Sequence, residues 1–269
     1  MKRPVYVSLA NLVAAAGVVL TPSTEDPTWL ATNVQSANRP FRPWKTTTTG
    51  SDQSVVVDFG SAKSFDLIAL VAVNFTAASV QANSSASWGA PPYTQAITIA
   101  RNPHNRRYQY GLILGAAISY RYLRLLIPTQ TPVDGGSIFK VGGLWVGTKT
   151  KLPSNFLADA GLGTITPFED VGPAHRGWRQ RLTLGEPVAT IQARRWVRMS
   201  SPHPMIADTL KSWMDLDRQT RDADYFALTL NSGDPSHSYV MRHLDQPTWS
   251  RSRLRRAESE WNLEEVVGP

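Results

Sequence analysis

The feature that most constrains the fold is a succession of short β-strand patterns, separated by turn-forming residues, in the first 150 residues. Each pattern is rich in β-branched or aromatic residues, which favour strands. Clusters of Gly, Pro, Asn and Ser between them mark chain reversals. Many short strands at this spacing predict an antiparallel sandwich or barrel. The expected strands are Ser54–Phe59, Leu67–Val73, Ala96–Ala100, Tyr108–Leu114, Tyr120–Ile127 and Ile138–Val146.

Two stretches of this half differ in what their residues predict. In Tyr120–Ile127, Leu123 and Leu125 fall on one side and Arg124 on the other, which is the pattern of a strand with one buried and one partly wet face. The stretch Ala77–Pro92 consists largely of Ala, Ser, Asn, Gly and Pro. That composition predicts a long exposed loop, with two aromatic residues near its end.

The chain has 269 residues, more than the ~100–150 typical of one domain, so two domains are expected. We place a linker at Gly147–Pro153 and the domains at 1–148 and 149–269. In Pro204–Arg221 apolar residues recur three or four apart, which predicts a helix packed on a sheet. The expected fold is therefore mainly β, a sandwich followed by an α+β domain with one main helix. The strands expected in the second domain are Gly177–Leu184, Thr190–Met199, Tyr225–Leu230, Ser238–Leu244 and Trp261–Val267.

The apolar run Val5–Leu20 follows Lys2 and Arg3, an arrangement similar to that of a signal peptide. Ser8 and Asn11 interrupt the run, and it is shorter than the ~20 apolar residues of a membrane helix. We therefore interpret it as the first strand of the folded domain and expect no membrane span.

The net charge of +7 is concentrated in the first half. Residues 1–150 carry 13 Lys and Arg against 6 Asp and Glu, whereas residues 151–269 carry 15 of each kind. The basic residues form no helical stripe and no groove-reading motif, so we expect no sequence-specific binding of nucleic acid. The chain has no cysteine, which excludes disulfides and thiolate metal sites.

Several motifs, taken in order over residues 5–147, resemble the discoidin, or galactose-binding-like, jelly roll. Trp44 follows a polar loop and precedes a strand that ends in Asp58-Phe59-Gly60, and a later strand reads Arg121-Tyr122-Leu123-Arg124-Leu125. The resemblance implies a jelly roll for domain 1–148, in which ligands such as sugars bind at loops on one end.

The segment Ser23–Trp29 is similar to the start of many minor tail proteins of long-tailed bacteriophages. The stretch FEDVGPAHRGW from Phe168 and the closing ESEWNLEEV resemble the tail-tube-like fold of tail hub and distal tail components. This resemblance implies a structural protein of the virion, located at the tail tip as a distal tail or baseplate hub protein. Its second domain would form a homo-oligomeric ring of six copies around the tail channel. The ring would contact the tail tube and hub proteins and carry the jelly roll outside. The domain order departs from the usual distal tail protein, in which the tube-like domain comes first.

The sequence holds no recognised catalytic constellation, so we expect no enzyme. It lacks a phosphate-binding glycine loop and a Gly-x-Ser-x-Gly turn. Its five histidines lack the spacing of a zinc protease. Asp222 and Asp224 offer too few oxygen ligands for calcium. We assign no catalytic residue, no metal ligand and no cofactor.

The aromatic residues of the exposed loop leave two interpretations open. Trp88 and Tyr93 pack against a neighbouring subunit or the domain's own surface, which is the commoner role, or they stack on a sugar. In the second case the chain would be a carbohydrate-binding adhesin module that attaches to host surface glycans, as the alternative to the tail-tip role. The ligand-binding residues under this alternative are Trp88, Tyr93, His104 and Arg106.

Overall fold

The computed structural model describes two sets of residues. It describes residues 6–35, 42–102, 107–151, 225–229, 235–236 and 238–241 in full, and the backbone of strands at 169–170, 178–183, 186–191, 195–200, 242–243, 248–253 and 256–265. In these parts the regular structure is β-strand, apart from the short 3-10 helices η1 (Leu12–Ala14) and η2 (Ala31–Gln35). The mainly β class is therefore confirmed.

Two other expectations concern helices. Within the described ranges, no helix has the length and apolar character needed to cross a membrane. The main helix expected at Pro204–Arg221, and with it the α+β character of the second domain, lies outside the described residues.

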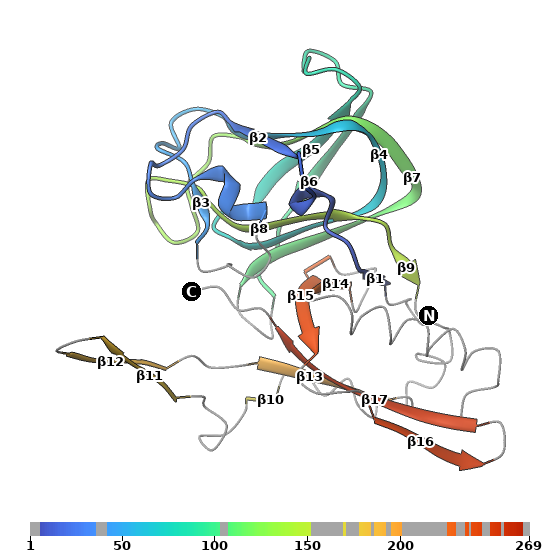
Figure 1. Cartoon of the computed structure of the whole chain (residues 1–269). Coiled ribbons are helices and arrows are strands. Elements are labelled where there is room, and N and C mark those ends of the chain that lie inside the picture. The colour runs from blue at the N-terminus through green and yellow to red at the C-terminus, as the bar shows by residue number, and fades with distance from the viewer. Residues whose placement is uncertain are drawn as a thin grey trace.

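Two long strands, β4 and β7, contribute to both layers of an antiparallel sandwich. One layer has the order β2–β4–β7–β5–β6 and uses residues 53–58 of β4 and 122–127 of β7. The other has the order β3–β8–β4–β7 and uses residues 67–73 of β4 and 108–113 of β7. Figure 1 shows both ribbons curving together from one layer into the other. The strands are β2 (Val19–Pro22), β3 (Trp44–Lys45), β4 (Gln53–Val73), β5 (Ala77–Asn83), β6 (Tyr93–Thr98), β7 (Tyr108–Ile127) and β8 (Lys140–Gly147).

Between the expected strands Ser54–Phe59 and Leu67–Val73 the chain bends at Gly60 and does not reverse, so the two form one strand. Gly60 has a φ of 74°, a conformation that glycine adopts without steric cost, and its N–H donates to Asp58 Oδ1 at 2.8 Å. The pairing register shifts between Asp58 and Lys63, as in a β-bulge, which bends a strand and increases its twist. The expected strands that merge are Ser54–Phe59 with Leu67–Val73 in β4, and Tyr108–Leu114 with Tyr120–Ile127 in β7.

The core lies between the two layers and is lined by alternate residues of these strands. Leu123, Leu125 and Ile127 are each 0% exposed, which confirms the inward face expected for this part of β7. Trp44 is also fully buried, and its indole N–H donates to the backbone carbonyl of Thr24 at 3.1 Å. Each large apolar side chain buried in this way stabilises the fold by ~1.5–3 kcal/mol, and packing of this kind holds a sandwich without disulfides.

The expectation of a continuous exposed loop at Ala77–Pro92 is wrong for its first half. That part forms β5, which pairs with both β6 and β7. Ala78, Val80 and Ala82 alternate into the core. Two alanines and one valine give a weak hydrophobic pattern in the sequence. Their small side chains nevertheless pack in the core, next to larger apolar residues. Residues 84–92 form the loop of the β5–β6 hairpin.

A second sheet joins the start of the chain to its second half. β1 (Tyr6–Ser8) lies between β14 (Phe226–Thr229) and β9 (Thr150–Lys151), and β14 forms a hairpin with β15 (Ser238–His243). The N-terminal apolar run thus contains a strand, as expected, but that strand belongs to the second sheet. The boundary expected after residue 148 falls between β8 and β9.

The remaining strands of the second half extend this sheet or form a separate pair. The sheet order is β10–β13–β17–β15–β14–β1–β9, with β16 beside β17, while β11 pairs with β12. β10, β16 and most of β12 were not expected from the sequence. The bounds are β10 (Glu169–Asp170), β11 (Trp178–Thr183), β12 (Glu186–Ile191), β13 (Arg195–Ser200), β16 (Thr248–Arg253) and β17 (Arg256–Glu265).

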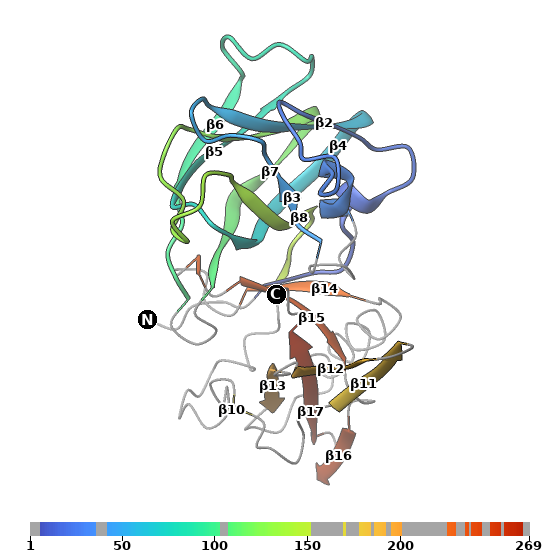
Figure 2. The same ribbon diagram turned by 90° about the vertical axis from the view of Figure 1, so that its left-hand side faces the viewer.

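The hairpin β14–β15 packs against the outer face of the layer β3–β8–β4–β7, as Figure 2 shows. The run Leu67–Val71 of β4 is buried on both faces. Ile68 and Leu70 point into the sandwich core, and the other residues of the run pack against Ala227 and Val240. A continuous apolar run is the pattern of a strand that is covered on both sides.

Buried polar groups fix the same interface. Asn102 Nδ2 and Gln109 Nε2 donate to the backbone carbonyl of Ser236 at 2.7 and 2.8 Å. The N–H of Gly111 donates to the carbonyl of Pro235 at 2.8 Å. Because Asn102 and Gln109 are each 0% exposed, loss of these bonds would leave buried polar atoms without partners, which is costly.

Gly111 is the position at which this interface is most sensitive to added volume. A Cβ atom at residue 111 would lie 2.6 Å from the Cβ of Ser238 in β15. We expect Gly111→Ala to lower the free energy of unfolding by about 1–3 kcal/mol, because one of the two strands must shift. Gly115→Ala is the control: a Cβ there meets nothing within 4 Å, so we expect a change within about 0.5 kcal/mol. Urea unfolding of both variants measures the difference, and equal stabilities would contradict the interface.

Candidate functional site

The candidate site lies on the outer face of the layer β2–β4–β7–β5–β6. Neighbours along the chain in β4, β7 and β5 alternate between the core and this face. One row across the face consists of directly opposed residues from successive strands. The row is Thr21, Val56, Arg124, Gln81 and Thr94.

Gln81, Trp88 and Arg124 form a compact group on this face, which we call the platform. Arg124 Nε donates to Gln81 Oε1 at 2.7 Å. Arg124 Cζ lies 4.6 Å from the centroid of the Trp88 ring, which is the geometry of a cation–π interaction. The guanidinium is thus held on one edge by an amide and on one face by an indole.

The hairpin loop of residues 84–92 carries Trp88 to this position. Asn83 Nδ2 donates to the carbonyl of Ser87 at 2.6 Å, and Asn83 Oδ1 accepts from the N–H of Ser84 at 2.7 Å. Bonds of this kind between an asparagine and the following backbone stabilise a turn. They fix the segment that immediately precedes Trp88, so the ring is positioned by the loop as well as by Arg124.

A neighbouring arginine on the same strand has its charge neutralised within the protein. Arg121 donates from Nε and Nη2 to the two carboxylate oxygens of Asp58 at 2.8 and 2.9 Å. The hydrogen bond from Arg121 lowers the pKa of Asp58, and the same bond raises the pKa of Arg121. Arg124 differs, since partial burial lowers its pKa and no carboxylate of the described residues bonds to it.

Two of the four residues that the sequence grouped as a ligand site lie within the described residues. Trp88 belongs to the platform, whereas Tyr93 lies opposite Ala82 and packs against the core. Burial raises the pKa of Tyr93, and nearby Tyr110 adds to this effect. His104 and Arg106 lie outside the described residues.

Two platform residues escaped the sequence analysis, for different reasons. Arg124 had a visible signal, because the alternation of Tyr120–Ile127 places it on the wet face of a strand. Gln81 had no such signal, because its strand β5 was interpreted as part of a loop. Trp44 and Trp145 are 0% and 3% exposed, so both pack in the interior of the protein.

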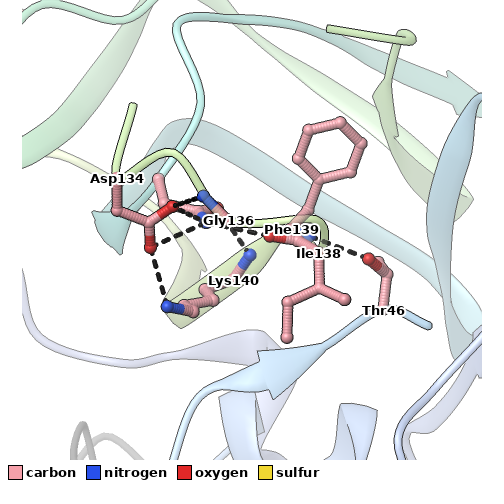
Figure 3. A network of polar contacts seen from close by, with 7 residues as sticks. Thr46, Asp134, Gly136, Ile138, Phe139 and Lys140 are labelled. Atoms are coloured by element: carbon pink, nitrogen blue, oxygen red, sulfur yellow. Dashed lines mark hydrogen bonds and ion pairs between the residues drawn. The ribbon is translucent and has the colours of Figure 1, made fainter. Parts of the chain in front are cut away.

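At the end of the sandwich away from the platform, a polar network holds the connection that follows β7 (Figure 3). Asn74 is 5% exposed, and its Nδ2 donates to the carbonyl of Ile138 at 2.9 Å and to Asp134 Oδ1 at 3.2 Å. Its Oδ1 accepts from the N–H of Lys140 at 2.7 Å. The groups of this network satisfy one another, so we assign it a structural role.

The same end of the sandwich carries another aromatic residue beside a cation. Lys45 Nζ lies 3.5 Å from the centroid of the Trp29 ring. The N–H of Thr28 donates to Asp26 Oδ1 at 2.8 Å and shapes the loop before the ring. Among the described residues, no three His, Asp or Glu side chains gather as a metal site would require.

The carboxylate of Asp134 makes the stability of this connection dependent on pH. Burial acts to raise the pKa of Asp134, but hydrogen bonds from Lys140, Gly136 and Asn74 outweigh it and hold the pKa below its ordinary value. The stabilisation is therefore present above the ordinary pKa and is lost as pH falls through the lowered one. We expect Asp134→Asn to lower the free energy of unfolding by about 0.5–1 kcal/mol at pH 7. The loss is small because Asp134 and its partner Lys140 are both partly exposed to solvent.

Urea unfolding from pH 7 to pH 2 measures this effect. The difference between the wild type and Asp134→Asn should shrink toward the acid end. In a Lys140→Gln background the same substitution should cost less at neutral pH. A difference that is constant with pH would rule out an ionised Asp134 as its source.

No protein-family model and no curated protein matches the chain. Solved structures do resemble about half of it. A Ruminococcus gnavus family 29 fucosidase in complex with fucose aligns at a TM-score of 0.41 and 14% identity, covering 52% of this chain and 27% of the fucosidase chain. The lectin domain of lectinolysin, complexed with Lewis B antigen, aligns at a TM-score of 0.41 and 12% identity, over 53% of this chain and 99% of that domain.

A carbohydrate-binding module also aligns with the chain. The family 32 module of NanJ from C. perfringens, in complex with galactose, has a TM-score of 0.39 and 15% identity, over 52% of this chain and 98% of that module. Similarities of this size carry no assignment of function.

Proposed function

We propose that the chain binds carbohydrate without catalysis, through the platform on the outer face of the sandwich. The observation that carries the proposal is the geometry of Trp88: a partly exposed indole, fixed beside a guanidinium and an amide. A sugar ring presents apolar C–H groups on its faces and hydroxyl groups around its edge. An aromatic ring suits the first, and amide and guanidinium groups suit the second.

The polar groups of the face are arranged to complete such a site. Gln81 is 8% exposed and accepts from Arg124 through Oε1, so its amide fixes the position of the guanidinium. Thr94 lies directly opposite Gln81 on β6 and adds a hydroxyl at the edge of the platform. Binding sites of this type combine an apolar surface with a few fixed polar groups.

The carboxylates of the sandwich support a non-catalytic role. Glycosidases place two carboxyl groups on either side of the scissile bond, and the row of residues that crosses the platform contains no acid. Each of the six acids in residues 1–150 accepts a hydrogen bond or pairs with a cation inside the protein. The pairs are Glu25 with the Ala31 N–H, Asp26 with the Thr28 N–H, Asp52 with the Thr129 N–H, Asp58 with Arg121, Asp66 with Lys149, and Asp134 with Lys140.

Substitution of the platform indole tests this function. We expect Trp88→Ala to reduce retention on a glycan array by at least about 10-fold, because stacking on the ring is lost. Tyr93→Phe is the matched control. Its hydroxyl is buried and has no hydrogen-bond partner among the described residues, so its removal should leave both retention and stability unchanged.

Because phenylalanine keeps the aromatic ring, the second substitution tests only whether the Tyr93 hydroxyl takes part in binding. Equal loss in both variants would return Tyr93 to the site. Failure of the wild type to retain any glycan would refute carbohydrate binding.

The structural role at a phage tail tip is our second proposal. The observation that favours it is the packing of the hairpin β14–β15 on the sandwich, which joins the two halves firmly, as a rigid structural subunit requires. Under this proposal, the chain assembles into a closed ring with tail tube and hub proteins as neighbours, and the virion tail tip is its location. Light scattering of the purified chain measures the oligomer: a ring of six copies supports the proposal, and a monomer that also fails to bind isolated tails refutes it.

A further inference from the structure

We propose that the sugar bound at the platform is anionic, and that Arg124 recognises a carboxylate or a sulfate ester on it. This inference rests on the proposed carbohydrate-binding function and names the ligand class.

The contacts of Arg124 leave one edge of its guanidinium open. Nε is bonded to Gln81 and the ring of Trp88 covers one face. Within the described residues, neither Nη atom has a protein partner, and neither is among the buried polar atoms that lack one. The Nη atoms are therefore accessible, and they belong to a guanidinium whose orientation is already fixed. A planar guanidinium donates two parallel hydrogen bonds to the oxygens of an oxyanion.

The charge of Arg124 is not compensated by the protein. By register, Asp58 is the nearest acid on β4, two residues from the partner of Arg124, but its two oxygens are engaged by Arg121. The pKa shifts of the two arginines have opposite directions. The hydrogen bond to Asp58 raises the pKa of Arg121, whereas burial lowers the pKa of Arg124. A half-buried cation without a counter-ion interacts more strongly with an anion than an exposed one does.

The net charge of the first half of the chain is positive, like the charge of Arg124. Residues 1–150 carry 13 basic against 6 acidic side chains, and the acids are occupied within the fold. An acidic polysaccharide would thus be attracted to this half of the molecule before it meets the platform. A neutral sugar would gain nothing from this field and would leave the Arg124 charge unpaired.

Binding of three related trisaccharides to the full chain tests the inference by calorimetry at 0.15 M salt. The first carries hexuronate carboxylates, the second is the same molecule with its carboxylates reduced to alcohols, and the third is the reduced molecule with one sulfate ester. We expect at least one acidic form to bind about 10-fold or more tightly than the reduced form. The two acidic arms then show which oxyanion the site prefers.

Substitution of Arg124 identifies the residue responsible. Arg124→Gln should weaken binding of the preferred acidic form by about 10-fold to 100-fold and bring its affinity close to that of the reduced form. Arg124→Lys keeps the charge but lacks the planar fork, so it should recover only part of the loss. Arg42→Gln is the control for net charge: this exposed residue precedes β3, in the other layer, and the preference for the acidic form should survive its loss.

The outcomes separate this inference from the function on which it rests. Equal binding of acidic and reduced forms by the wild type, with loss of both in Trp88→Ala, overturns the anionic ligand and keeps carbohydrate binding. An acidic preference that Arg124→Gln leaves intact overturns the role of Arg124. Absence of binding in all three arms overturns the anionic ligand, and carbohydrate binding is refuted as well if the glycan array also retains nothing.

Discussion

The pairing of β4 with β7 is the contact on which the sandwich depends. Both strands run through the two layers, and each is bent where its middle residues are exposed. Every other strand of the sandwich pairs with one of these two strands or with a direct neighbour of one. β2 and β8 pair with β4, β5 pairs with β7, β3 pairs with β8, and β6 pairs with β5. The platform inherits its geometry from this arrangement, because Arg124 is an outward residue of β7 and Gln81 is its direct neighbour on β5.

The second half of β4 is buried on both faces, so the second sheet also depends on this strand. Because its residues face the sandwich core on one side and the hairpin β14–β15 on the other, a change in either packing reaches both. Gly111 and the buried amides of Asn102 and Gln109 belong to the same contact. The two halves of the chain are therefore mechanically connected through side chains, in addition to the covalent connection at Lys151.

Sequence reasoning recovered those parts of the fold that carry a strong periodic signal. The alternation in Tyr120–Ile127 and the apolar run of Leu67–Val73 both lie in strands as expected. The reasoning failed where the signal was weak or non-local. Ala78 and Ala82 are too small to mark an inward face, so β5 was interpreted as loop. A glycine can mark a bend as well as a reversal, so Gly60 did not reveal that β4 is continuous.

The candidate site was only partly within reach of the sequence. Trp88 could be found because an aromatic residue in a polar loop is conspicuous. The alternation of Tyr120–Ile127 placed Arg124 on a wet face, but its contact with Trp88 could not be predicted, because that contact depends on how the hairpin folds back. Tyr93 was grouped with Trp88 by proximity in the chain, yet the first residue of β6 faces the core. Sequence distance gives no information about which face of a sheet a residue occupies until the register is known.

The position of β1 between β9 and β14 has a consequence for synthesis on the ribosome. Tyr6 pairs with Thr229, so the first strand emerges more than 200 residues before its partner. The sandwich strands are complete by Gly147, and until β14 and β15 emerge the apolar face of β4 stays exposed to solvent. Contacts of such separation form late, and exposed apolar strands in the meantime favour aggregation. The nascent chain thus passes through a stage that a chaperone is suited to protect.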